Sequence, residues 1–165
     1  MFELKPISHD AIPVALEKAE RYRLLNEPAQ AESICLDILR IDPDNQKALV
    51  MMLLALTDQL GSGGAATRAK AVVSRLKGEY ERAYYTGIVC ERSARASFDN
   101  GAPGAAFSSY DLFREAMEWY EKAEALRLPG NDDAVLRWNT CVRTLQKNPS
   151  LRPRPEESFE PVLGE

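Results

Sequence analysis

Residues 26–45 of this 165-residue chain read NEPAQAESICLDILRIDPDN, and they are the most informative stretch for the fold. Pro28 suits the first turn of a helix, where the amide hydrogen that proline lacks has no partner to bind. The residue before a proline avoids the α conformation, so Asp42-Pro43 indicates where that helix ends. Between these limits the apolar side chains recur every three or four residues, at Ala31, Ile34, Cys35, Ile38 and Leu39. The stretch therefore predicts an amphipathic helix over residues 28–41.

The same helical periodicity extends outward from this stretch, from residue 10 to about residue 147. Nowhere does a sustained alternation of apolar and polar residues indicate a strand. The pattern predicts an all-α chain whose first helix starts after Ser8 or Asp10 and whose sixth is capped by Ser108 or Ser109. The expected helices cover about residues 10–26, 28–41, 45–60, 65–77, 79–98, 108–128 and 133–146.

Helices of this length joined by turns invite a search for a repeat near 34 residues, and residues 12–45 contain one. This unit resembles a tetratricopeptide repeat (TPR), because mostly small side chains, with one aromatic ring beside them, occupy the positions at which its two helices meet. The segment from Asn26 to Glu32 is similar to the usual TPR turn, and the segment from Ile38 to Asn45 is similar to its ending. The contact positions are held by Ala15, Ala19, Tyr22, Ala31, Cys35 and Ile38.

The resemblance implies a right-handed superhelical array of about three TPR-like helix pairs with a C-terminal capping helix. We expect units at about 12–45, 46–78 and 79–129, a cap at 131–147, and thus one repeat domain over residues 1–147. The second unit lacks the terminal proline. The third has Gly87 where a small residue is wanted, and its turn is expected to be much longer than usual. Arg137, Arg143 and Lys147 of the cap are expected to face solvent, and residues 148–165 to form a flexible, proline-rich acidic tail.

Composition and charge narrow the class of protein. Hydrophobic residues make up 45% of the chain and charged residues 28%, values typical of a folded globular protein. The net charge of −4 argues against a nucleic-acid partner. The longest apolar run, residues 48–56, is too short to span a membrane, and the N-terminus lacks the pattern of a secretory signal. The sequence thus predicts a cytoplasmic protein without a membrane partner.

No constellation of side chains points to catalysis, a cofactor or a metal. His9 is the only histidine, so no histidine-based triad or multi-histidine site can form. The turn at residues 61–64 (GSGG) lacks the strand and the following Lys-Ser or Lys-Thr of a phosphate-binding loop. The three widely spaced cysteines, expected in the core, fit neither a disulfide framework nor a zinc site. We therefore expect no enzyme, and no cofactor or metal.

The resemblance to TPR proteins implies an interaction scaffold, an adaptor or a chaperone-like holder. Such proteins bind a peptide or helix of a partner in a concave groove lined by the first helix of each pair. Met51 and Leu54 could equally pack against a neighbouring helix, and only one of the adjacent Tyr84 and Tyr85 is expected to face the core. The residues expected in the groove are Leu16, Glu20, Arg23, Lys47, Val50, Met51, Leu54, Asp58, Tyr84, Tyr85, Ile88 and Arg92.

Some TPR proteins clamp a C-terminal carboxylate with Lys, Arg and Asn side chains in this groove, and the present chain departs from that pattern. An apolar or partly basic ligand is therefore expected instead. The corresponding positions hold Leu16, Glu20, Met51, Glu81 and Tyr85.

Two alternatives remain open at this point. The predicted helix 65–77 contains Arg68, Lys70, Arg75 and Lys77 without an acid, which would suit an RNA-associated or enzyme-regulatory helical repeat, although a solvated outer face also explains it. The tail offers a different occupant for the groove, since its apolar side chains could fold back into the same molecule or into a second copy of the chain. These tail residues are Phe159, Val162 and Leu163.

Overall fold

The computed structural model describes residues 1–61 and 63–156, and within them it contains helices and no strand. The prediction of an all-α chain is therefore confirmed. A short 3-10 turn, η1 (His9–Ala11), precedes the α-helices. These are α1 (Ile12–Leu24), α2 (Pro28–Ile41), α3 (Gln46–Thr57), α4 (Ala65–Val73), α5 (Glu79–Asn100), α6 (Ala105–Leu126) and α7 (Asp133–Lys147).

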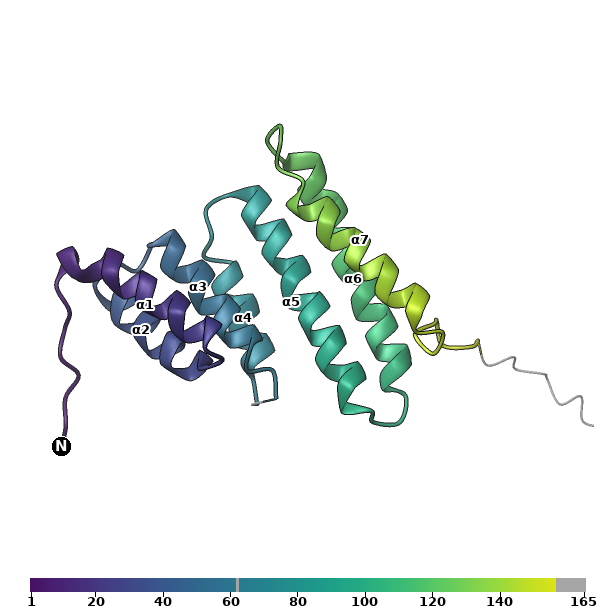
Figure 1. Cartoon of the computed structure of the whole chain (residues 1–165), viewed down its shortest axis with the longest axis horizontal. Helices are drawn as coiled ribbons and strands as arrows, with labels where there is room; N and C mark the ends of the chain where they lie inside the picture. Colours follow the sequence, from purple (N-terminus) through teal and green to yellow (C-terminus); the bar gives the residue numbers. More distant parts are fainter. Residues whose placement is uncertain (62, 157–165) are drawn as a thin grey trace, which may run out of the picture.

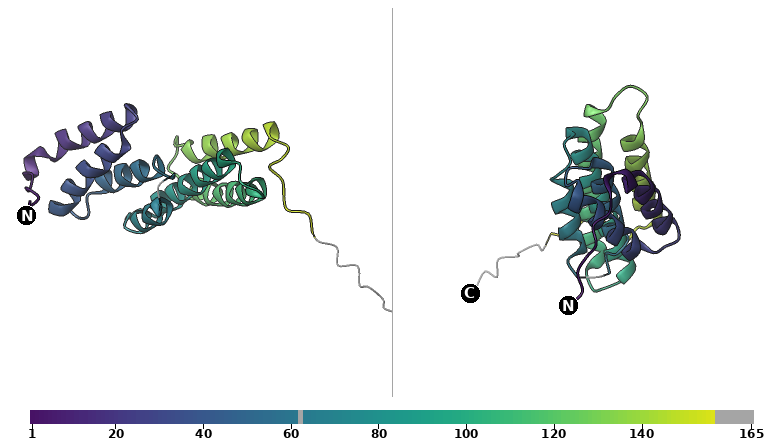
Figure 2. Two further views of the ribbon diagram at one scale, coloured as in Figure 1. Left: turned by 90° about the horizontal axis from the view of Figure 1, so that it is seen from below. Right: turned by 90° about the vertical axis from the view of Figure 1, so that its left-hand side faces the viewer.

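The helices pack in chain order into an elongated array (Figure 1). Helix α1 pairs with α2, α3 with α4 and α5 with α6, while α7 lies against α6 at the end of the array. The left view in Figure 2 shows α1 and α7 on the same side of the array, at opposite ends of its length. The exposed surfaces of α3 and α5 therefore lie between α1 at one end of the array and α7 at the other.

Two large apolar clusters hold the array together. One is built from α1 to α4 together with Val89 of α5, around buried side chains such as Leu49 and Leu53, and the other from α5 to α7 around Phe113 and Tyr120. Leu54 and Tyr85 pack against both clusters. The apolar contacts therefore run continuously from the first helix pair to the last helix.

Several helix boundaries agree with the sequence-based expectation. Helix α2 covers residues 28–41 with Pro28 in its first turn, and Asn45 caps α3 by accepting a hydrogen bond from the amide of Ala48 at 2.9 Å. Others differ, because α4 ends at Val73, before the expected residue 77. The prediction of a serine cap on α6 was wrong: Ser109 is buried inside that helix, which begins after Gly104.

The turn of the third pair is short, contrary to expectation. It contains only residues 101–104, and the extra length of this unit lies in α5 and α6, which have 22 residues each. Gly101 and Gly104 adopt positive φ angles of 67° and 77°, which favour glycine, and so reverse the chain within four residues. The polar Asp99 and Asn100 that seemed to belong to a loop instead complete the last turn of α5.

Gly87 allows α5 and α6 to approach closely. A Cβ atom on this residue would lie 2.5 Å from Cε1 of Tyr120, inside the van der Waals limit. Tyr120 itself is fully buried. The expectation that a small residue is needed here is thus explained by the ring that takes the space.

The chain after α7 is partly fixed on the helical array. Residues 148–156 contain no helix, but Leu151 is 4% exposed in the apolar cluster of α5 to α7. The Arg154 guanidinium lies 5.5 Å from the centre of the Phe107 ring. The first part of the expected flexible tail is therefore anchored by packing, whereas Phe159, Val162 and Leu163 lie outside the described residues.

Candidate functional site

Six of the residues expected in the groove line one open space between α1, α3 and α5, which we call the inner hollow. Its volume is about 780 Å³, and Leu16, Val50, Met51 and Tyr85 are among its apolar lining residues. Glu20 and Lys47 are exposed at its edge. The lining also includes side chains that the repeat pattern did not single out, namely Ile12, Pro13, Glu17, Asn45 and Gln46.

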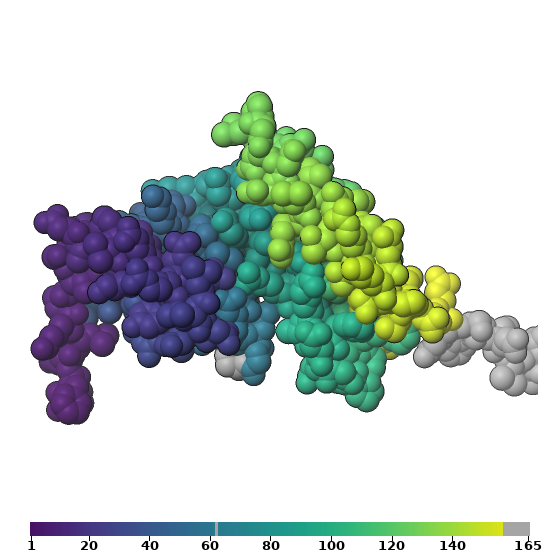
Figure 3. Space-filling model, in the orientation of Figure 1, coloured from purple at the N-terminus to yellow at the C-terminus, as the bar shows by residue number. Residues whose placement is uncertain are grey.

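Figure 3 views the array in the orientation of Figure 1, with α1 and α2 in purple at one end, α7 in yellow at the other and teal residues between them. We call the surface formed by the exposed sides of α1, α3 and α5 the inner face. Met51 and Tyr85 reach this face from helices that are neighbours in space but separate in the sequence. The inner hollow thus exists only where these helices are stacked.

Three further predicted residues form a charged group next to the inner hollow, which we call the Asp58 cluster. Arg23 of α1 donates to Asp58 at 2.7 Å, and Arg92 of α5 donates to the other carboxylate oxygen at 2.6 Å. Arg92 also donates to the hydroxyl of Thr57 at 2.7 Å. Since Asp58 follows α3, this single carboxylate connects the first helices of all three pairs.

The remaining predicted groove residues serve mainly in packing. Ile88 is only 4% exposed and lies in the cluster of α5 to α7, so a partner could not reach it in this structure. Leu54 is half-buried between the two main clusters. Tyr84 is also half-buried, with its ring centre 6.0 Å from that of Tyr120, whereas Tyr85 lines the inner hollow. Ile88 was therefore placed on the wrong side of α5.

A second charged group, the Glu91 cluster, connects α5, α6 and α7 and was missed by sequence reasoning. The Glu91 carboxylate is fully buried and accepts a hydrogen bond from the Tyr120 hydroxyl at 2.7 Å. It pairs with Arg95 of the same helix at 3.0 Å and with Arg137 of α7 at 2.8 Å. The expectation that Arg137 faces solvent freely was wrong, because it anchors α7 to α5. A buried carboxylate needs such partners to offset the loss of water.

The protonation of both clusters follows from burial and neighbouring charge. Burial lowers the pKa of Arg92, and Asp58 only partly opposes that change. Burial is also the largest single influence on Arg137 and acts in the same direction, but the charge of Glu91 together with Tyr120 and Tyr84 outweighs it, so the pKa of Arg137 is raised overall. Burial also raises the pKa of Tyr84 to about 12, so this phenol stays neutral at physiological pH. The inner face therefore presents guanidinium groups that are charged and already paired with carboxylates.

The site has the chemistry of a binding surface with an apolar part and a charged part. Cys35, Cys90 and Cys141 are buried thiols, and burial raises the pKa of each to about 12, so they are poor nucleophiles. Across the part of the chain that the structure describes, no group of three or more metal-ligating side chains is placed to hold a metal ion.

Comparison with known proteins finds no match: no protein-family model, no curated protein and no solved structure corresponds to the chain. Among the helices of residues 1–61 and 63–156, none combines the length and the apolar character of a membrane span.

Proposed function

We propose that this protein is a cytoplasmic TPR-like scaffold that holds a peptide or helix of a partner protein on its inner face. In this proposal α1 to α6 form three helix pairs of a right-handed superhelix and α7 is the capping helix. The pairing of successive helices and the flanking positions of α1 and α7 support this assignment. Stacked helix pairs commonly offer an extended concave surface for binding.

The observation that carries the proposal is the inner hollow. Its lining joins apolar side chains from three helices, and Met51 and Tyr85 are only half-buried there. A methionine gives an adaptable apolar contact and a tyrosine a rigid one, and residues of both kinds are enriched at protein interfaces. A large apolar side chain of the partner would fill the hollow.

The polar edges of the inner hollow and the Asp58 cluster would orient that partner. Glu20 and Lys47 flank the apolar surface with opposite charges, which favours a ligand of mixed charge. In the Asp58 cluster, Arg23 and Arg92 share a single carboxylate. Two guanidinium groups on one carboxylate leave a net positive charge and further N–H donors, from which carbonyl or carboxylate oxygens of a bound segment can accept hydrogen bonds.

The alternative use of the basic helix, in RNA binding or enzyme regulation, has weaker support. Arg68 forms an ion pair with Glu32, and Arg75 donates to the carbonyl of Pro43 at 2.7 Å. Two of the four cations of residues 65–77 are thus used within the protein, and Arg75 and Lys77 lie beyond the end of α4. Raising the salt concentration distinguishes peptide binding from RNA binding, since binding in an apolar hollow persists at high salt whereas contacts to RNA phosphates weaken steeply.

The test is capture of partners from a native lysate of the source cells with wild-type protein and with groove variants. Met51→Asp and Tyr85→Asp place a charge in the inner hollow, and we expect each to abolish capture of the proteins held by wild type. Circular dichroism must show unchanged helicity. Because both residues also touch the core, the double variant Glu20→Lys/Lys47→Glu serves as a surface-only change that should reduce capture.

The matched control is Leu36→Asp on α2. Leu36 is 52% exposed and does not line the inner hollow. Its capture profile should equal that of wild type. Equal capture by all groove variants would contradict the assignment of the inner face.

A further inference from the structure

A second open space lies on the opposite side of α5, between α4, α5 and α6, and we call it the outer hollow. Its volume is about 630 Å³. Arg82 and Thr86 of α5 line it, one helical turn apart, whereas Tyr85 and Arg92 of the same helix serve the inner face. The two sites are therefore separated by the body of α5.

The outer hollow is open because the helices around it differ in length. Helix α4 ends at Val73 after nine residues, whereas α5 and α6 extend beyond its end (Figure 1). The chain then crosses to α5 without α-helical structure over residues 74–78. Arg82 fixes this connection by donating to the carbonyls of Leu76 and Lys77, both at 2.8 Å.

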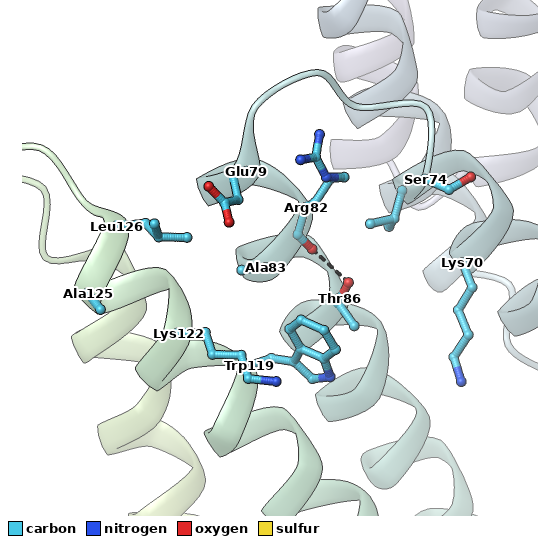
Figure 4. Close-up of a pocket in the computed structure, with 11 residues that line it drawn as sticks. Lys70, Ser74, Glu79, Arg82, Ala83, Thr86, Trp119, Lys122, Ala125 and Leu126 are labelled. Carbon is cyan, nitrogen blue, oxygen red and sulfur yellow. Dashed lines mark hydrogen bonds between the residues drawn. The ribbon is translucent and has the colours of Figure 1, made fainter.

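The base of the outer hollow is apolar. Figure 4 shows the Trp119 indole beside Thr86 in the space between α5 and α6, with Leu126 farther along α6. Val73 and Ala83 contribute further apolar surface, and Leu126 is 41% exposed. An indole next to aliphatic side chains offers a large area for an apolar group of a ligand.

Three cations stand around this apolar base: Lys70 of α4, Arg82 of α5 and Lys122 of α6. Among the described residues none of them forms an ion pair with a carboxylate, although Glu79 also lines the space. The Lys122 ammonium lies 4.0 Å from the centre of the Trp119 ring. The arginines of the inner face differ, since each of them already has a carboxylate partner.

We propose that the outer hollow binds an acidic segment of another protein, one that carries an aromatic or large aliphatic side chain next to its carboxylates. The apolar side chain would lie against Trp119 and Leu126, and the carboxylates would accept from Lys70 and Lys122. Unpaired positive charge around the hollow in a chain of net charge −4 favours a short acidic segment over a long polyanion, which the rest of the surface repels. This site is independent of the inner face.

The experiment uses the full chain and a display library of random twelve-residue peptides. Peptides selected on wild type are then measured against the charge-reversal variant Lys70→Glu/Lys122→Glu. Both lysines are exposed, so the variant should fold. The control variant Lys18→Glu/Lys147→Glu carries the same change of net charge on α1 and α7, away from the hollow.

We expect a set of peptides that loses about tenfold or more in affinity for Lys70→Glu/Lys122→Glu and little for the control. This set should be rich in Asp or Glu together with Phe, Trp or Leu. The proposal is overturned if no selected peptide distinguishes the two variants, or if the peptides that do are basic or lack a large apolar residue.

Trp119 supplies a direct reading of where these peptides bind. The chain has two tryptophans, so Trp138→Phe leaves Trp119 as the only one. Its emission should change when a discriminating peptide is added. An unchanged emission spectrum at saturation would place the peptide elsewhere and contradict the proposed site.

Discussion

Replacing Glu91 by glutamine tests the most heavily buried charge in the described structure. The side chain is fully buried and bonds to Tyr120, Arg95 and Arg137, so Glu91→Gln keeps the shape but removes the charge that pairs with two guanidinium groups. Breaking a buried ion pair by removing one partner costs about 3–5 kcal/mol. The side chains of Arg95 and Arg137 are 42% and 32% exposed, so water can hydrate them in part. We therefore expect the lower end, about 3 kcal/mol.

Urea denaturation followed by circular dichroism measures this loss, and a thermal scan should show a Tm lower by about 6–12 °C. Glu118→Gln, an exposed carboxylate on α6, is the matched control and should change the free energy of unfolding by less than about 0.5 kcal/mol. A loss below about 1 kcal/mol for Glu91→Gln, similar to the control, would refute the reasoning that this carboxylate fixes α7 on α5.

Three further outcomes follow from packing and burial. Gly87→Ala should destabilise the protein by about 1–3 kcal/mol, because the added methyl group would overlap the Tyr120 ring. The control Gly61→Ala, which has open space around it, should be nearly neutral. Equal urea midpoints for the two variants would contradict this account. Iodoacetamide at pH 8 should modify none of the three thiols in the native protein and all three in urea, as counted by mass spectrometry. The thiols' contribution to stability should be constant below pH 9 and fall above it, since thiols with a folded pKa of about 12 ionise first in the unfolded chain. A urea midpoint unchanged between pH 8 and pH 11 would exclude this effect for Cys35, Cys90 and Cys141.

Much of the local structure could be predicted from short-range patterns. Pro28 and Asp42-Pro43 bracket a helix whose bounds the structure reproduces, because proline constrains its own φ angle and the conformation of the residue before it. The need for a small residue at Gly87 was also visible in the repeat pattern, although the ring that requires it lies on another helix.

The sequence could not reveal contacts between distant charges. Arg137 looks like an ordinary solvated arginine of an amphipathic helix, and its partner Glu91 precedes it by 46 residues. Nothing in the pattern around Glu91 distinguishes it from an exposed glutamate. Only the packing of α7 against α5 and α6 brings the two together and removes water from the carboxylate.

The candidate groove was predictable to the extent that helical periodicity assigns a face to each residue. Met51 and Tyr85 line the inner hollow as expected, but Ile88 turns inward because α6 and α7 cover that side of α5. The rotation of a helix relative to its neighbours depends on packing at its other faces. A pattern within one helix does not contain that information.

The central claim, that the inner face holds a partner segment, is tested most directly by placing a photo-crosslinking amino acid at single positions of the full chain. At Tyr85, inside the inner hollow, irradiation in a native lysate should attach a partner protein. At Leu36, exposed on α2 outside the hollow, it should attach none of the same protein. Crosslinking of the same protein from Leu36 but not from Tyr85 would contradict the claim.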